Sequence, residues 1–353
     1  MLITINECYS DNIGDQAINI ALVEELKKRG EDVFSIDFSG LMPNQLNDNT
    51  NANISHKGRY WFVPKMLKTP LIQLLWVKRT LFSLIRCAYS NKKIKAIIIG
   101  GGQIFQSNGL FPIRLFLIGM VAKFFKIDVI CYSIGVSKDI TPIDKILIMS
   151  LLKRSILIYT RDKFSQEQLF NWGLFSVKLA PDIVFLLNLN KFKLNKKINE
   201  ANYALIGVPH IGHIKKVKHK IKEDEYFLWW YEKYMELSLS QNVYLFYNTR
   251  YDMASSIRFK KWVLKKYNTK IIIKHTQTID ELLSLIQSSS LLVSGRMHSL
   301  IFGDILNIPV EAYEFSRKIK GFVEMKKKYK SLTSLKKEVS NSLDWTCKRL
   351  NNK

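Results

Sequence analysis

Short apolar runs alternate along the chain with longer segments in which apolar residues recur every three or four positions. The first pattern is typical of strands, and the second is typical of helices that bury one face. The strand-like runs are 2–5, 33–37, 96–99, 129–133, 156–159, 204–208, 243–247, 270–274 and 291–293. The helix-like segments are 17–26, 115–125, 143–152, 164–172, 226–239, 256–266 and 279–287, with another after His298. This alternation predicts an α/β fold of doubly wound parallel sheets.

One segment divides this pattern into two series. Residues 188–202 are rich in Lys and Asn and carry neither strand nor helix spacing. A chain of 353 residues is long enough for two domains that each have a core. We therefore expect a Rossmann-like domain over 1–190, a second one over 191–325, with a cleft between them, and a basic helical tail over 326–353.

The chain is strongly basic, with 54 Lys and Arg against 30 Asp and Glu and a net charge of +24. Nucleic acid, an anionic membrane or an acidic substrate would each suit this charge, and a solvated lysine-rich surface explains it equally well. The aromatic residues do not interleave with basic ones as in nucleic-acid surfaces, so we expect no nucleic-acid partner. No apolar run reaches the ~18 residues of a membrane span. Four scattered cysteines without metal-ligand spacing favour a cytoplasmic protein.

The segment 61–89 combines leucines and other apolar residues at helical spacing with lysines and arginines. Two interpretations fit this basic amphipathic pattern. The helix can lie on an anionic bilayer, which would place the protein at the inner face of the plasma membrane. It can equally pack on a neighbouring domain with its lysines at the rim.

The strongest candidate site is Ser294-Gly295-Arg296-Met297-His298, which follows an apolar run and precedes a helix-like segment. Open α/β sheets bind ligands at such strand ends, and a helix N-terminus favours an anion. Arginine is the usual side chain for binding an anion, and histidine commonly acts as an acid or base, so Arg296 and His298 suit an anion site with a proton transfer. A lone histidine is usually structural, but the neighbouring Arg296 favours a functional role for His298.

Three further motifs follow strand-like runs, and each has a structural alternative. Asn12-Ile13-Gly14-Asp15 opens a helix, where Asn12 can be a cap and Asp15 a first-turn carboxylate. Gly100-Gly101-Gly102-Gln103 can bring its backbone close to a ligand or form a plain tight turn. Arg161 can bind an anion or only pair with Asp182, while Asp162 caps the following helix.

In their order along the chain, these motifs resemble the polysaccharide pyruvyl transferase family. The resemblance also covers 132–135, a helix ending at Gly173, 180–182, Pro309 and the closing segment that contains Lys318, and it runs from about residue 3 to about 325. It implies a GT-B-like fold, with the acceptor bound on the N-terminal side and the donor on the C-terminal side. It also implies an enzyme that transfers a pyruvyl group from phosphoenolpyruvate to two hydroxyls of a glycan, forming a ketal.

The resemblance assigns roles to residues. Arg296, His298 and Asp15 would be catalytic; the donor would be bound by Arg296, Met297, His298, Lys318, His210 and Arg161. The acceptor, a glycan or lipid-linked oligosaccharide for capsule or exopolysaccharide, would be bound by Asn12, Gly14, Asp15, Gly101, Gly102 and Gln103. His298 would move a proton, and the scheme requires neither a metal nor a cofactor besides the donor substrate.

One position departs from the family. Members commonly carry an arginine after the first strand of the second domain, whereas this chain has Gly207-Val208-Pro209-His210. His210 or another cation takes over the donor contact, or the donor differs, or activity is lost. Two other functions stay open: a nucleotide-sugar glycosyltransferase, with Glu311 or Glu314 contacting the ribose, and a non-catalytic membrane-associated assembly protein.

Overall fold

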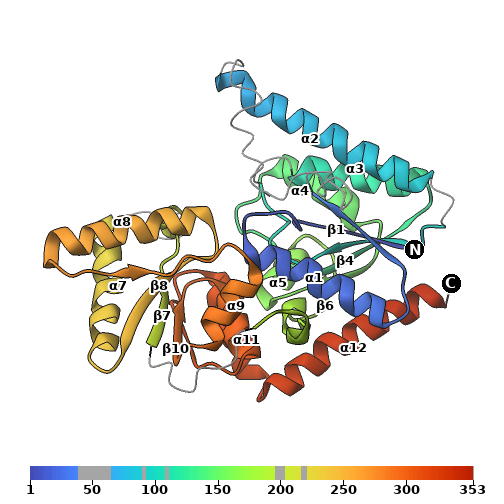
Figure 1. The fold of residues 1–353 in the computed structure, drawn as a ribbon. Helices are drawn as coiled ribbons and strands as arrows, with labels where there is room; N and C mark the ends of the chain where they lie inside the picture. Colours follow the sequence, from blue (N-terminus) through green and yellow to red (C-terminus); the bar gives the residue numbers. More distant parts are fainter. Residues whose placement is uncertain (39–64, 90–92, 108–110, 195–202, 216–220, 353) are drawn as a thin grey trace. The chain divides into compact units, whose positions relative to one another are not determined.

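The computed structural model of the chain describes residues 1–38, 65–89, 93–107, 111–194, 203–215 and 221–352. They form two compact units, each with its own parallel sheet (Figure 1). Unit 1 contains Met1–Ser10, Ile18–Ile183 and Lys337–Lys353, and unit 2 contains Asp11–Ala17 and Val184–Lys336. The main division thus falls after Ile183 instead of at residue 190, and one N-terminal stretch belongs to unit 2. Residues 61–64 of the expected basic helix lie outside the described residues.

The sheet of unit 1 has the strand order β2-β1-β3-β4-β5-β6, and its strands are parallel. Its strands are β1 (Leu2–Asn6), β2 (Val33–Asp37), β3 (Ala96–Gly100), β4 (Asp128–Ile134), β5 (Ser155–Thr160) and β6 (Lys178–Leu179). The strands β1 and β3 are buried on both faces. This explains why β3 is apolar throughout, whereas β1 also buries the polar residues Thr4 and Asn6.

Helices cover both faces of this sheet. Its helices are α1 (Ile13–Lys28, in unit 1 from Ile18), α2 (Lys65–Ala88), α3 (Phe111–Phe124), α4 (Pro142–Leu152), α5 (Lys163–Asn171) and α12 (Leu332–Asn351, in unit 1 from Lys337). In Figure 1, α2, α3 and α4 lie on one side of the sheet, and α1 and α12 lie on the other. Isoleucines of β1 and β3 share a core cluster with Leu115, Ile118 and Leu151 of α3 and α4. This is the doubly wound arrangement that the alternation predicts.

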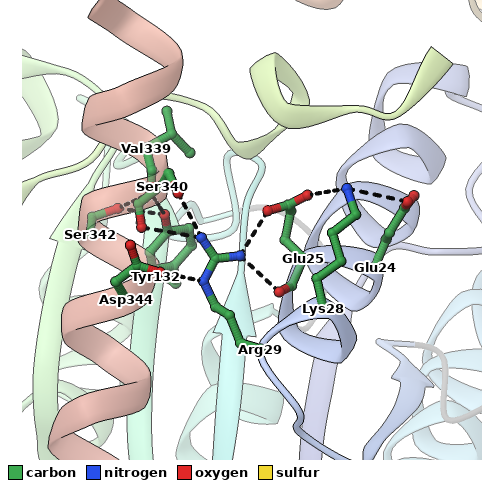
Figure 2. Close-up of polar contacts among 9 residues, drawn as sticks. All are labelled: Glu24, Glu25, Lys28, Arg29, Tyr132, Val339, Ser340, Ser342 and Asp344. Carbon is green, nitrogen blue, oxygen red and sulfur yellow. Dashed lines mark hydrogen bonds and ion pairs between the residues drawn. The ribbon is translucent and has the colours of Figure 1, made fainter.

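The C-terminal helix α12 is fastened to unit 1 by polar contacts around Arg29 (Figure 2). Arg29 Nε donates to Asp344 at 2.7 Å, and its Nη2 donates to the Ser340 hydroxyl at 2.7 Å. Nη1 donates to the Glu25 carboxylate at 2.7 Å, which joins α12 to α1. A second contact joins α12 to β4, where Tyr132 and Ser342 share a hydrogen bond of 2.6 Å. The expected tail is therefore an integral helix of this unit from Lys337 onward.

The sheet of unit 2 has the parallel strand order β11-β10-β7-β8-β9. Its strands are β7 (Tyr203–Gly207), β8 (Asn242–Phe246), β9 (Ile272–Ile273), β10 (Leu291–Ser294) and β11 (Val310–Ala312). Its helices are α6 (Ile211–Lys215), α7 (Glu223–Ser238), α8 (Arg250–Tyr267), α9 (Ile279–Gln287), α10 (Met297–Ile305) and α11 (Arg317–Lys328). Aromatic side chains of α7 and α8, including Tyr226, Trp230 and Phe259, fill the core against β7 and β8.

Two Rossmann-like units in one chain make the fold class GT-B-like, as the sequence predicts. The expected elements are present, and their ends differ mainly where helices begin. The helix expected from 256 begins at Arg250, and the one expected from 115 begins at Phe111. The apolar residues after Pro181 form a 3₁₀ turn, Ile183–Leu186. All four cysteines are buried free thiols. None of the helices in the described part of the chain is both long and apolar enough to cross a bilayer.

Candidate functional site

The connection from β10 to α10 consists of Gly295 and Arg296 alone, so the strand leads almost directly into the helix. Arg296 occupies the N-cap position with an extended backbone, and its amide donates to the Ser294 hydroxyl at 3.0 Å. The amides of the first helical turn have no carbonyl partner within their own helix. Together with the helix dipole, they favour an anion at this end of α10. The sequence prediction of a strand, a turn and a helix start is confirmed here.

The guanidinium of Arg296 is held by a carboxylate on a neighbouring helix. Its Nε donates to Asp252 Oδ2 at 2.9 Å, and its Nη2 donates to Asp252 Oδ1. Asp252 lies in the first turn of α8, and its side chain is 3% exposed, whereas that of Arg296 is 25% exposed. Such a two-point contact fixes the plane of the guanidinium. The Nη1 group takes no part in this pair.

His210 lies beside this pair. Its backbone amide donates to Asp252 Oδ1 at 2.9 Å, and its Nδ1 accepts a hydrogen bond from the Gly212 amide at 3.2 Å. Burial lowers the pKa of His210, Asp252 opposes this shift, and the positive charge of Arg296 adds to it. The shift favours the uncharged imidazole. At the position where the family commonly has an arginine, this chain has a histidine whose pKa is lowered.

The N-terminus of α1 lies directly against His298, within unit 2. A Cβ atom on Gly14 would come within 2.0 Å of His298 Nδ1 and 2.6 Å of His298 Cβ, so only glycine permits this packing. The His298 side chain is buried in the first turn of α10. The close approach of His298 thus explains why the Asn12–Asp15 motif has a glycine at this position, and it places the motif next to the candidate histidine.

Polar contacts within the Asn12–Asp15 turn, and from Asn248 to the starts of α1 and α10, support this arrangement. The Asn12 side chain accepts from the Gly14 amide at 3.1 Å and donates to Asp15 Oδ2 at 2.8 Å. Asn248, which follows β8, donates to the Ser299 hydroxyl at 2.8 Å, and its carbonyl accepts from the Ile13 amide at 3.4 Å. Asn12 therefore has the capping role of the structural alternative, while Asp15 lies close to the α1 end that contacts His298.

Lys318 occupies the first turn of α11, whose N-cap is Ser316. Its side chain is half-buried. The helix follows β11, the neighbour of β10, so Lys318 comes after the carboxyl end of an adjacent strand. Five of the residues predicted to bind the donor substrate therefore lie in unit 2. His210, Arg296, Met297 and His298 follow strand ends, and Lys318 follows the next strand of the sheet.

The remaining predicted residues belong to unit 1. Gly101 and Gly102 have φ angles of +63° and +75°, and a Cβ on Gly101 would come within 2.2 Å of Ile18. The Gly102 carbonyl accepts from the Gly135 amide at 2.8 Å, and Gln103 donates to the Ser137 hydroxyl at 2.9 Å. The turn is thus required by backbone conformation and packing, as its structural alternative states.

Arg161 is a buried ion-pair residue. Its side chain is 3% exposed and lies against Gly135. Its guanidinium approaches Asp162 Oδ2 at 3.5 Å and Asp182 Oδ2 at 3.9 Å. Asp162 also caps α5 by accepting from the Ser165 amide at 2.7 Å. Both contacts are those of the structural alternative, and a donor contact of Arg161 stays a prediction.

Sequence reasoning missed two residues that build the site, Asp252 and Asn248. Both follow β8, so their position at the carboxyl end of a strand was an available signal. A second signal was Thr249 three residues before Asp252, because the Thr249 hydroxyl accepts from the Asp252 amide and caps α8. Their partners Arg296 and Ser299 lie more than 40 residues further along the chain, which no local pattern reveals.

Comparison with protein families gives one match that covers most of the chain. The family model described as polysaccharide pyruvyl transferase matches residues 12–312. The matched range begins at Asn12 and includes Arg296 and His298. No curated protein matches the chain closely enough to count as a relative.

Solved structures with the same fold include UDP-GlcNAc 2-epimerases from three organisms. The enzyme from Methanocaldococcus jannaschii, solved with UDP-GlcNAc and UDP, has 14% identity and a TM-score of 0.52, with 96% of this chain and 91% of that one covered. The Neisseria meningitidis enzyme bound to UDP-GlcNAc has 12% identity and a TM-score of 0.52, with 100% and 99% covered. The Rickettsia bellii enzyme has 11% identity and a TM-score of 0.55, with 99% and 96% covered. At these identities the likeness concerns the fold alone.

Proposed function

The chain belongs to the polysaccharide pyruvyl transferase family, and from that premise we propose that it transfers a pyruvyl group from phosphoenolpyruvate to two hydroxyls of a surface-polysaccharide precursor. The product is a ketal, and inorganic phosphate is released. The acceptor is a glycan or a lipid-linked oligosaccharide.

The observation that supports this most is the group of Arg296, His298 and the α10 N-terminus. Phosphoenolpyruvate is a small anion with a carboxylate and a phosphate, and it needs a fixed cation together with oriented N–H donors. Arg296 is oriented by Asp252. Arg296 is the N-cap of α10, and His298 lies two residues later in the first turn of the helix.

The reaction defines the proton transfers that these residues must serve. The methylene carbon of the donor gains one proton and becomes a methyl group, and the first glycan hydroxyl adds to the neighbouring carbon. Loss of phosphate and addition of the second hydroxyl complete the ketal. Of the two protons that leave the hydroxyls, one balances the methyl group and the other leaves with phosphate. His298 is suited to carry a proton in this sequence because one imidazole nitrogen can donate a proton and the other can accept one.

On the acceptor side, we assign the turn from Asn12 to Asp15 to the binding of the glycan hydroxyls. Asp15 lies near the α1 end that packs on His298, and its carboxylate can orient or deprotonate a hydroxyl. Gly101, Gly102 and Gln103 in unit 1 stay predicted acceptor contacts.

Incubation of the protein with phosphoenolpyruvate and candidate glycans tests the proposal. We expect acceptor-dependent release of phosphate and a glycan product that carries a pyruvate ketal. His298→Ala should lower the rate by about 100-fold or more if the histidine moves a proton. Release of phosphate that is unchanged in this variant would remove His298 from the mechanism.

A nucleotide-sugar glycosyltransferase is the second candidate, because one carboxylate of unit 2 suits a ribose. Glu314 is exposed and follows β11, whereas Glu311 is engaged by Lys233 at 2.9 Å. Thermal stabilisation by UDP or GDP, with none by phosphoenolpyruvate, would favour this function over pyruvyl transfer.

A further inference from the structure

Helix α2 exposes a row of large apolar side chains on its outer face. Leu74 is 65% exposed, Phe82 67% exposed, and Ile85 38% exposed, and Tyr89 just after the helix is 72% exposed. Their spacing of eight, three and four residues places them along one side of the helix. A helix that served only to cover the sheet would turn such residues toward the core.

The opposite face of α2 already meets the protein, and it is partly polar. Thr80, Ser83, Leu84 and Cys87 are buried, and the Thr80 hydroxyl donates to the Phe38 carbonyl at 3.1 Å. The buried face of α2 therefore mixes polar and apolar residues, although large apolar residues lie on its outer face. The packing of α2 on unit 1 does not depend on the apolar residues of the outer face. Exposed apolar residues that lie together often mark a binding surface.

Helix α3 extends this apolar face. Met120 is 46% exposed and Phe124 76% exposed. The Tyr89 ring meets the Phe125 ring at a centroid distance of 5.4 Å, and the Phe124 and Phe125 rings meet at 5.0 Å. Because α2 and α3 pack side by side (Figure 1), these residues continue the outer face. We name it the α2–α3 surface, which consists of Leu74, Phe82, Ile85, Tyr89, Met120 and Phe124.

All charged residues of α2 and α3 are basic. Between Asp48 and Asp128 the sequence contains thirteen Lys and Arg and no Asp or Glu. Lys78 and Arg86 of α2 and Lys123 of α3 are exposed among the apolar residues of the surface. With no carboxylate in the two helices, these cations create a local positive potential.

We propose that the α2–α3 surface binds an anionic lipid bilayer, with its apolar side chains at the acyl boundary and its cations at the headgroup phosphates. Interfacial helices combine these two features. A second copy of the chain is a poorer occupant, because a two-fold interface places the same cations against one another. The α2–α3 surface belongs to unit 1 alone, so lipid binding there does not depend on the proposed transfer reaction.

Vesicle sedimentation with the full chain tests this proposal without donor or glycan. We expect binding to vesicles of phosphatidylcholine and phosphatidylglycerol, weak binding to phosphatidylcholine alone, and loss of binding at ~1 M NaCl, where the screening length is about 3 Å. Replacement of Lys78 and Arg86 by Gln should weaken binding about 30-fold, since each cation near an anionic surface contributes about fivefold. Phe82→Ser with Phe124→Ser should weaken it at least about tenfold, even at low salt.

Matched controls come from exposed residues of unit 1 that lie outside this surface. Lys163→Gln removes an exposed cation, and Phe175→Ser removes an aromatic residue that is 81% exposed. Both should leave vesicle binding within about twofold. Equal losses in the control and surface variants would overturn the assignment of the surface. Absence of lipid binding, or concentration-dependent dimerisation that Phe82→Ser abolishes, would overturn the lipid as its occupant. Donor binding is measured separately, so its failure leaves this result unaffected.

Discussion

Replacement of Gly14 by Ala tests the packing of the α1 N-terminus on His298. The added Cβ would lie 2.0 Å from His298 Nδ1, 2.4 Å from Cγ and 2.6 Å from Cβ, all shorter than a van der Waals contact. Because His298 is buried and one of these atoms is next to its backbone, the ring cannot simply rotate away. Either the imidazole or the first turn of α1 must move.

Two opposing effects set the size of the change. Ala is the better helix former and would stabilise α1 by about 1 kcal/mol at a helical position without contacts. Forcing extra volume into a packed site costs about 3 kcal/mol. We therefore expect Gly14→Ala to lower the free energy of unfolding by about 2 kcal/mol, and to slow phosphate release because His298 is displaced.

The control is the same substitution in a His298→Ala background. There the contacts at 2.0 and 2.4 Å no longer exist, and only the one with Cβ persists. Urea unfolding of the four proteins should give a favourable coupling free energy of about 1–2 kcal/mol between the two positions. If Gly14→Ala has the same effect in both backgrounds, the two segments do not pack as described.

Three further changes probe the site and its supports. Asp252→Asn removes the buried negative charge that pairs with Arg296, so the free energy of unfolding in urea should fall by about 2 kcal/mol. An unchanged value would show that the two residues do not form this ion pair. Burial lowers the pKa of His210 below its usual 6.5. As the pH drops, His210 is therefore protonated more readily in the unfolded chain than in the folded one, and the free energy of unfolding falls below about pH 6.5. The thermal midpoint of His210→Asn should decline less than that of the parent between about pH 7 and pH 5, and parallel declines would contradict the shift. Arg29→Met removes the hydrogen bonds that Arg29 donates to Asp344, Ser340 and Glu25, so the free energy of unfolding in urea should fall by about 2–3 kcal/mol. As a control, Arg349→Met on the exposed face of α12 should lower it by less than about 0.5 kcal/mol. Equal losses in the two variants would argue against the Arg29 contacts.

Much of the fold follows from local pattern. Continuous apolar runs such as 96–99 identified the buried strands, because parallel strands covered on both faces need apolar residues throughout. The Ser294–His298 stretch was predicted as strand, turn and helix, since an apolar run, a glycine and helical spacing follow one another. The start of α8 at Arg250 was missed because its first turn has no apolar periodicity and is set by the Thr249 cap.

The site depends on contacts between distant segments, and here the sequence was less informative. Gly14 was recognised as part of a motif, but its reason, the close approach of His298, joins residues 284 positions apart. Asp252 at the start of α8 contacts Arg296 at the start of α10, and these two residues are likewise distant in the sequence. The sequence of α2 predicts a basic amphipathic helix, whereas the contribution of α3 cannot be read from a sequence that is apolar nearly all round.

Isothermal titration of the full chain with phosphoenolpyruvate and, separately, with UDP measures donor binding directly. We expect that phosphoenolpyruvate binds and that UDP does not compete with it. Arg296→Gln should weaken binding by about tenfold or more, as expected for loss of a charge-assisted contact. Binding of UDP without binding of phosphoenolpyruvate, or an affinity for phosphoenolpyruvate that Arg296→Gln leaves unchanged, would contradict the proposed function.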